Sequence, residues 1–211
     1  MNQHKDMFEY VRNQLDKAEH DPQANKGKIH YERYDHTVRV YKWMIRITNE
    51  LNDDNLDLES LKVATIFHDC GYGYETEKLP HPHASAIICR DYLERRDYSP
   101  EKVGFICDLI EQHSEKSRIS DVETPIELVV LMEADMLDDT GAMGLILDTW
   151  IEATDEKASF ESMRKHIEKY TYRHMKNVNM VTAPAKRFWH EKRKLVYDFI
   201  RQYRRDLGDM K

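Results

Sequence analysis

Four side chains that can bind a metal ion fall on predicted helix faces that are otherwise apolar. Because residues three or four apart share one face of a helix, each of the four points where its apolar neighbours point. A buried carboxylate is costly unless it is paired or bound to a metal ion. A core hydrogen bond explains each histidine taken singly, and a salt bridge or helix cap would explain the acid, but one ion explains all of them together. The four residues are His36, His68, His113 and Asp135.

Asp69 directly follows His68, and this pair constrains where an ion can lie. Neighbouring residues on a helix point about 100° apart, so both can reach one ion only near the end of the helix. Gly71 indicates such an end. An aspartate in this place can also bridge two ions with its two oxygens. Mixed imidazole and carboxylate ligands suit Mn, Fe, Co, Ni, Zn or Mg, and Cys70 is predicted to be a small buried residue rather than a ligand.

A helical scaffold is what the composition predicts for holding these residues. Of 211 residues, 40% are hydrophobic and 34% charged, but only 7 are Gly and 6 are Pro. So few turn-forming residues favour long helices joined by short loops. We therefore predict an all-α fold, a single-domain helical bundle over residues 1–211. Its motif core spans about 30–150, and C-terminal helices at about 156–207 pack on that core.

The spacing of apolar residues predicts the individual helices. Loops are expected at 21–29, 71–82 and 114–123. The last helix is basic and aromatic, and we expect it to be amphipathic with Phe188, Leu195, Phe199 and Tyr203 facing inward; a nucleic-acid surface is the alternative. The predicted helices span 3–20, 31–51, 58–70, 83–96, 100–113, about 125–139, 156–178 and 184–207.

Charge and cysteine content limit the classes of partner and the compartment. The formal net charge of −7 gives no overall attraction to nucleic acid or to an anionic membrane. The three cysteines, an odd number, argue against a disulfide framework and favour a reducing, cytoplasmic setting. No apolar run approaches the roughly 20 residues of a membrane-spanning helix, and the N-terminal residues lack the apolar stretch of a signal peptide.

Three segments in order resemble the HD-domain metal-dependent phosphohydrolase superfamily. They are DHTVRV (35–40), FHDCGY (67–72) and MEADMLDDTGAMG (132–144). The resemblance covers about residues 30–150. It implies a helical HD-domain fold and a metal ion bound by His36, the His68-Asp69 pair and Asp135, with His68 and Asp69 as catalytic residues.

The same resemblance implies a second metal ion. Members with two ions carry two further histidines between the His-Asp pair and the last aspartate. His81 in HPHAS and His113 in IEQHS fit these positions, with His83 competing with His81. Asp69 would then bridge the ions. In members with one ion, these histidines would instead orient the substrate.

The expected activity is hydrolysis of a small phosphorylated substrate by metal-activated water. The third segment looks most like the small bacterial branch that hydrolyses nucleotides, so a nucleotide is the expected substrate. Arg39 and Lys78 are candidates for holding its phosphates. The alternatives are a metal- or nucleotide-binding module without turnover and a di-iron oxygenase on the same scaffold. The substrate, the native metal and the oligomeric state are left open, with a homodimer among the assemblies that the sequence allows.

Overall fold

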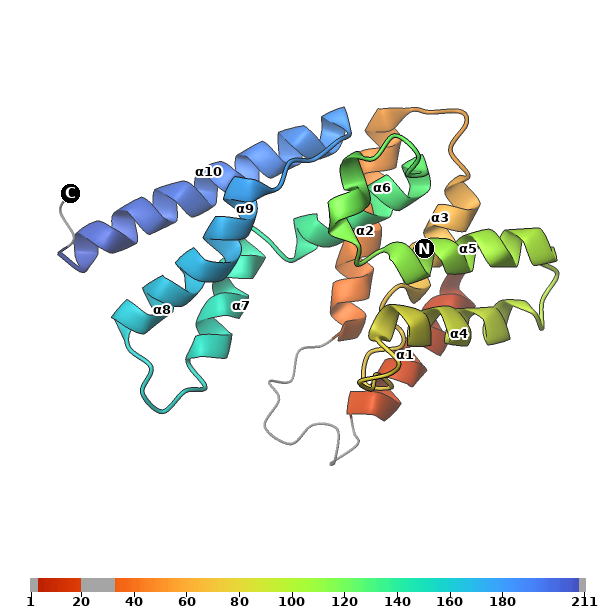
Figure 1. The fold of residues 1–211 in the computed structure, drawn as a ribbon, viewed down its shortest axis with the longest axis horizontal. Helices are drawn as coiled ribbons and strands as arrows, with labels where there is room; N and C mark the ends of the chain where they lie inside the picture. The colour runs from red at the N-terminus through yellow and green to blue at the C-terminus, as the bar shows by residue number, and fades with distance from the viewer. Residues whose placement is uncertain (1–3, 20–32, 209–211) are drawn as a thin grey trace. The chain divides into compact units, whose positions relative to one another are not determined.

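The computed structural model describes residues 4–19 and 33–208, and it is helical throughout (Figure 1). The predicted loop at 21–29 lies outside the described residues. Within the described ranges there is no strand, and an isolated bridge joins Thr76 and Leu79. The predicted all-α class is therefore confirmed. None of the described helices is both long and apolar enough to cross a lipid bilayer.

The chain divides into two compact units, unit 1 (Met1–Ala134) and unit 2 (Asp135–Lys211). The boundary falls within helix α6, Ile126–Asp138. The packing of the C-terminal helices on the motif core stays a prediction. Unit 1 also contains α1 (Lys5–Glu19), α2 (Arg33–Leu51), α3 (Leu58–Phe67), α4 (His81–Leu93), α5 (Pro100–Gln112) and the short 3₁₀-helix η2 (Lys116–Ser120).

Helix α3 is the central element of unit 1, because it packs against α1, α2, α4 and α5. Its sequence explains this position, since a helix that is mostly apolar is stable only when most of its surface is buried. All of its residues from Val63 to Phe67 are buried. The side chain of Asp57 caps the N-terminus by accepting a hydrogen bond from the backbone N–H of Ser60 at 3.0 Å. The helix ends at Phe67, so the His-Asp pair begins the following turn.

A close approach between backbones holds this turn against α4. The N–H of Gly71 donates to the hydroxyl of Ser85 on α4 at 2.8 Å. A Cβ atom placed on Gly71 would lie only 2.8 Å from the carbonyl carbon of Ala84, and closer still to the backbone nitrogen of Ser85. Glycine is therefore required here for the turn after α3 to contact α4.

Unit 2 contains one helix that the apolar pattern did not predict. This is α7 (Ala142–Glu152), which begins after Gly141, whose φ of +69° lies in the left-handed region that favours glycine. The predicted helix at 156–178 is interrupted by a π-helical turn. The remaining elements are α8 (Phe160–Ile167), the π-turn η3 (Glu168–Tyr172), α9 (Arg173–Asn177) and α10 (Ala183–Asp206).

Helix α10 buries a different face from the one predicted. Its buried residues are Pro184, Ala185, Trp189, Val196 and Ile200. Leu195 and Phe199, predicted to face inward, are 46% and 41% exposed. The two faces are adjacent on the helix, and both carry apolar residues, so the sequence alone did not distinguish them.

Asp148 on α7 makes the stability of unit 2 depend on pH. Burial raises the pKa of its carboxyl, although the backbone N–H of Thr171 donates to it at 3.2 Å. Because the folded-state pKa is raised, stability is fully present below the unfolded value of about 3.9 and is lost as pH rises through the folded-state value. Asp148→Asn should therefore unfold at a higher urea concentration than the wild type at about pH 8, with a smaller difference near pH 4. An equal difference at both pH values would contradict this account.

Candidate metal centre

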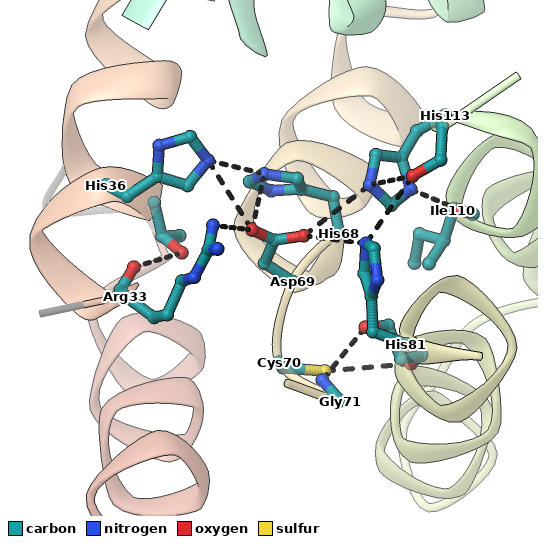
Figure 2. Close-up of polar contacts among 12 residues, drawn as sticks. Arg33, His36, His68, Asp69, Cys70, Gly71, His81, Ile110 and His113 are labelled. Atoms are coloured by element: carbon teal, nitrogen blue, oxygen red, sulfur yellow. Dashed lines mark hydrogen bonds and ion pairs between the residues drawn. The ribbon is translucent and has the colours of Figure 1, made fainter. Parts of the chain in front are cut away.

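The His-Asp pair occupies the first two positions after α3. His68 is the C-cap residue of that helix and is fully buried, and Asp69 is 3% exposed. This is the helix-end position that lets neighbouring side chains converge. The carboxylate of Asp69 lies at the centre of the site, where side chains from α2, α4 and the end of α5 surround it (Figure 2).

The two oxygens of Asp69 face two different pairs of histidines. Oδ2 lies 3.5 Å from Nε2 of His36 and 3.7 Å from Nε2 of His68. Oδ1 lies 3.4 Å from Nε2 of His81 and 3.5 Å from Nε2 of His113. The ligand atoms of His36, His68 and Asp69 all lie within 4.8 Å of one another, and the same holds for those of Asp69, His81 and His113. The carboxylate is thus placed to bridge two positions, each with two imidazole nitrogens.

Backbone carbonyls fix the tautomer of two of these imidazoles. Nδ1 of His68 lies 2.8 Å from the carbonyl oxygen of Thr65. Nδ1 of His113 lies 2.6 Å from the carbonyl oxygen of Ile110 (Figure 2). A carbonyl oxygen only accepts hydrogen bonds, so each Nδ1 must carry the hydrogen. In the neutral ring, the lone pair is then on Nε2, which faces Asp69. This is the usual arrangement of a histidine that binds a metal ion.

The donor set fits a divalent metal ion. Nε2 of His68 lies 3.4 Å from Nε2 of His36, so either a hydrogen on the His36 nitrogen or a cation lies between the two nitrogens. Ligand atoms bound at about 2.1 Å to a common ion are separated by roughly 3.0–3.4 Å, close to the separations found here. Buried imidazole and carboxylate groups suit a divalent transition metal or Mg.

The electrostatic surroundings keep Asp69 ionised. Burial alone would raise the pKa of its carboxyl. When the imidazole rings carry a proton at Nε2 in place of a metal ion, the charge of His68, a hydrogen bond from His113 and the charges of Arg33 and His36 together outweigh burial and hold that pKa well below its usual range. The carboxylate is therefore in the form that binds a metal ion.

Arg33 is a member of the site that the sequence did not reveal. Its Nη1 donates to Oδ2 of Asp69 at 3.3 Å, and its guanidinium carbon lies 3.7 Å from the ring centre of Tyr72. Arg33 precedes His36 by three residues on α2, so the helical periodicity that placed His36 could have found it. Of the arginines near His36, the sequence interpretation considered only Arg39, on the C-terminal side of that histidine.

The structure distinguishes between the two histidines at the start of α4. His81 is the first residue of the helix and lies beside Asp69. Burial lowers the pKa of His81, which favours the neutral imidazole that a metal ion requires. The side chain of His83 is 56% exposed, and its nearest acid is Glu111 at 3.7 Å. His81, rather than His83, is therefore the histidine that lies at the carboxylate of Asp69.

The other predicted site residues lie as follows. Arg39 is half-buried on α2, and Lys78 is exposed in the loop before α4. Cys70 is buried, with its thiol directed at the carbonyl oxygen of Ser85 at 3.6 Å, in agreement with a packing role. Asp135 is 8% exposed on α6 and is the first residue of unit 2. Its binding of the ion held by His36 and His68 stays a prediction.

Comparisons with known proteins match the chain to one domain family. Residues 33–140, just over half of the chain, match the model of the HD domain. No curated protein matches the chain in sequence.

Solved structures share the fold at low sequence identity. Bacillus subtilis YpgQ in complex with ADP is 20% identical with a TM-score of 0.68, over 97% of this chain and 95% of that one. An HD-superfamily hydrolase from Bacillus thuringiensis is 17% identical with a TM-score of 0.66, over 96% and 98%. A predicted HD superfamily hydrolase from an uncultured Thermotogales bacterium is 17% identical with a TM-score of 0.62, over 95% and 92%. With the match to the domain model, these likenesses in fold place the chain in a family: it belongs to the HD domain family.

Proposed function

We propose that this chain is a divalent-metal-dependent phosphohydrolase that acts on a small phosphorylated substrate, a nucleotide being the best candidate. The observation that carries the proposal is the buried carboxylate of Asp69, with each of its oxygens facing a pair of imidazole nitrogens. Burying such a carboxylate in a protein core costs free energy unless a cation or another positive group offsets the loss of its hydration. Hydrolysis of phosphate bonds is a reaction for which bound divalent ions are well suited.

The residues have separate roles in this proposal. His36, His68 and Asp135 would hold one ion and His81 and His113 a second, with Asp69 bridging them. Ions held there would supply an activated water and a Lewis-acid contact to a phosphoryl oxygen. The carbonyl oxygens of Thr65 and Ile110 keep the imidazoles of His68 and His113 in the orientation that binding requires.

Two observations support a nucleotide as the substrate. YpgQ, which shares the fold, was solved in complex with ADP. In this chain, the guanidinium of Arg33 lies beside Asp69, and a guanidinium is well suited to hydrogen-bonding a phosphate through two of its N–H groups. We include Arg33 with Arg39 and Lys78 as the proposed phosphate contacts.

Metal removal and reconstitution test the proposal. The chain is stripped with a chelator, reloaded separately with Mn, Mg, Co, Ni, Fe or Zn, and assayed for release of phosphate or pyrophosphate from nucleoside mono-, di- and triphosphates. We expect hydrolysis with at least one ion and none in excess chelator. Protein shown to contain metal that releases nothing from any of these substrates would contradict the proposal.

The same preparation separates the two alternative functions. Tight nucleotide binding without turnover would indicate a binding module. Oxygen consumption, together with an iron-dependent visible spectrum, would indicate a di-iron oxygenase.

A further inference from the structure

His81 is held differently from the other two histidines whose Nδ1 contacts are known. His68 and His113 each have a backbone carbonyl oxygen within hydrogen-bonding distance of Nδ1. For His81, the acid nearest to Nδ1 is Glu75, whose Oε2 lies 3.8 Å away, too far for a hydrogen bond. The side chain of His81 is also more exposed, at 21%. The hydroxyl of Ser114 lies 3.4 Å from Nε2 of His81, on the side of the ring that faces Asp69, so a contact elsewhere on the ring must set the plane of this imidazole.

The ring of Tyr72 provides that contact. Its centre lies 4.4 Å from the centre of the His81 ring, and the two planes are inclined by 35°. The same tyrosine ring lies 3.7 Å from the guanidinium carbon of Arg33, which itself donates to Asp69. Tyr72 is therefore held by α2 through Arg33 and packs on the first residue of α4.

We infer that Tyr72 is a positioning residue for the second metal ion and that it acts through His81. Its ring fixes the imidazole plane so that Nε2 points to Oδ1 of Asp69, the role that carbonyl oxygens have for His68 and His113. This rests on the proposed function, because it requires His81 and His113 to hold an ion.

The aromatic ring of Tyr72, rather than its hydroxyl group, should be responsible for its effect on the binding of the second ion. Both contacts of Tyr72 described here are made by its ring, and stacking of this kind is set by the aromatic system. Removing a group that orients a metal ligand typically lowers metal affinity about 10- to 100-fold. Tyr72→Phe should therefore bind the second ion as the wild type does, whereas Tyr72→Ala should not.

Titration with Mn²⁺ alone, followed by calorimetry, tests the inference without any substrate. We expect the wild type to bind two ions. Tyr72→Ala should lower the affinity for the second ion about 10- to 100-fold and leave the affinity for the first unchanged. Tyr72→Phe should bind the second ion with wild-type affinity. Because Tyr72 acts through His81, adding Tyr72→Ala to His81→Ala should cause no further loss, which a double-mutant cycle measures.

Tyr74→Ala is the matched control. Tyr74 lies in the same loop, and its hydroxyl donates to the carbonyl oxygen of Gln14 at 3.3 Å, so its removal loosens the loop without removing the ring beside His81. We expect it to bind both ions like the wild type.

Three outcomes would overturn the inference: wild-type affinity in Tyr72→Ala, an equal loss in Tyr74→Ala, or a wild type that binds one ion only. Because no nucleotide is present, failure of the proposed hydrolysis would be seen separately, in the assay of phosphate release.

Discussion

Asp69→Asn is expected to abolish hydrolysis and to lower the metal content while the chain stays helical. The substitution keeps the shape of the side chain and removes the charge that faces both pairs of imidazoles. A bound metal ion contributes several kcal/mol of transition-state stabilisation, and each 1.36 kcal/mol is a factor of ten in rate. We therefore expect kcat to fall by at least about 1,000-fold. Elemental analysis, circular dichroism and phosphate release measure the three effects.

His83→Ala is the control for this substitution. His83 lies two residues from His81 on the same helix, but its side chain is 56% exposed and is near Glu111 rather than Asp69. Its removal should leave metal content and activity unchanged. Full activity in Asp69→Asn would refute the assignment of Asp69 as the central ligand.

Gly71→Ala is expected to destabilise the chain and to weaken metal binding at the same time. The added methyl group would overlap the backbone of α4 at Ala84 and Ser85, and a helix backbone cannot move aside as a flexible side chain does. Overpacking typically costs about 1–3 kcal/mol. Because α4 carries His81, its displacement would also move one ligand away from Asp69. Urea unfolding and Mn²⁺ titration measure the two effects.

Gly104→Ala is the comparison for Gly71→Ala. Gly104 lies inside α5, and a Cβ atom placed there would meet no atom within 4 Å. Replacing a glycine by alanine in a helix interior stabilises by about 0.5–1 kcal/mol. The two substitutions should therefore have opposite effects on unfolding. A stabilised Gly71→Ala variant would mean that the turn and α4 are not in the contact described.

The sequence predicted the part of the site that depends on local periodicity. His36 and His68 share faces with apolar neighbours, so a helical pattern alone was enough to predict their burial. The start of α4 was placed two residues too late, at 83 instead of His81. Pro82 accounts for the difference, because proline is well accommodated in the first turn of a helix.

Contacts between side chains that are far apart in the sequence were not predicted. Arg33 and Tyr72 are far apart in sequence, and only the fold brings the guanidinium over the ring. The same limit applies to α10, where Phe199 and Ile200 lie on adjacent faces and packing decides which is buried. In such cases the local sequence pattern predicts that a helix forms. Which face of that helix is buried depends on the surfaces of the helices that pack against it.

The positions of His68 and His113 have one more consequence. Each is the C-cap residue of its helix, so the C-terminal ends of α3 and α5 both lie at the carboxylate of Asp69. The aligned peptide dipoles of a helix place about half a negative charge at that end. Part of the attraction for a divalent cation therefore comes from the main chain, which no side-chain substitution removes. Asp69→Asn should accordingly keep a weak, salt-sensitive affinity for Mn²⁺ even after its activity is lost.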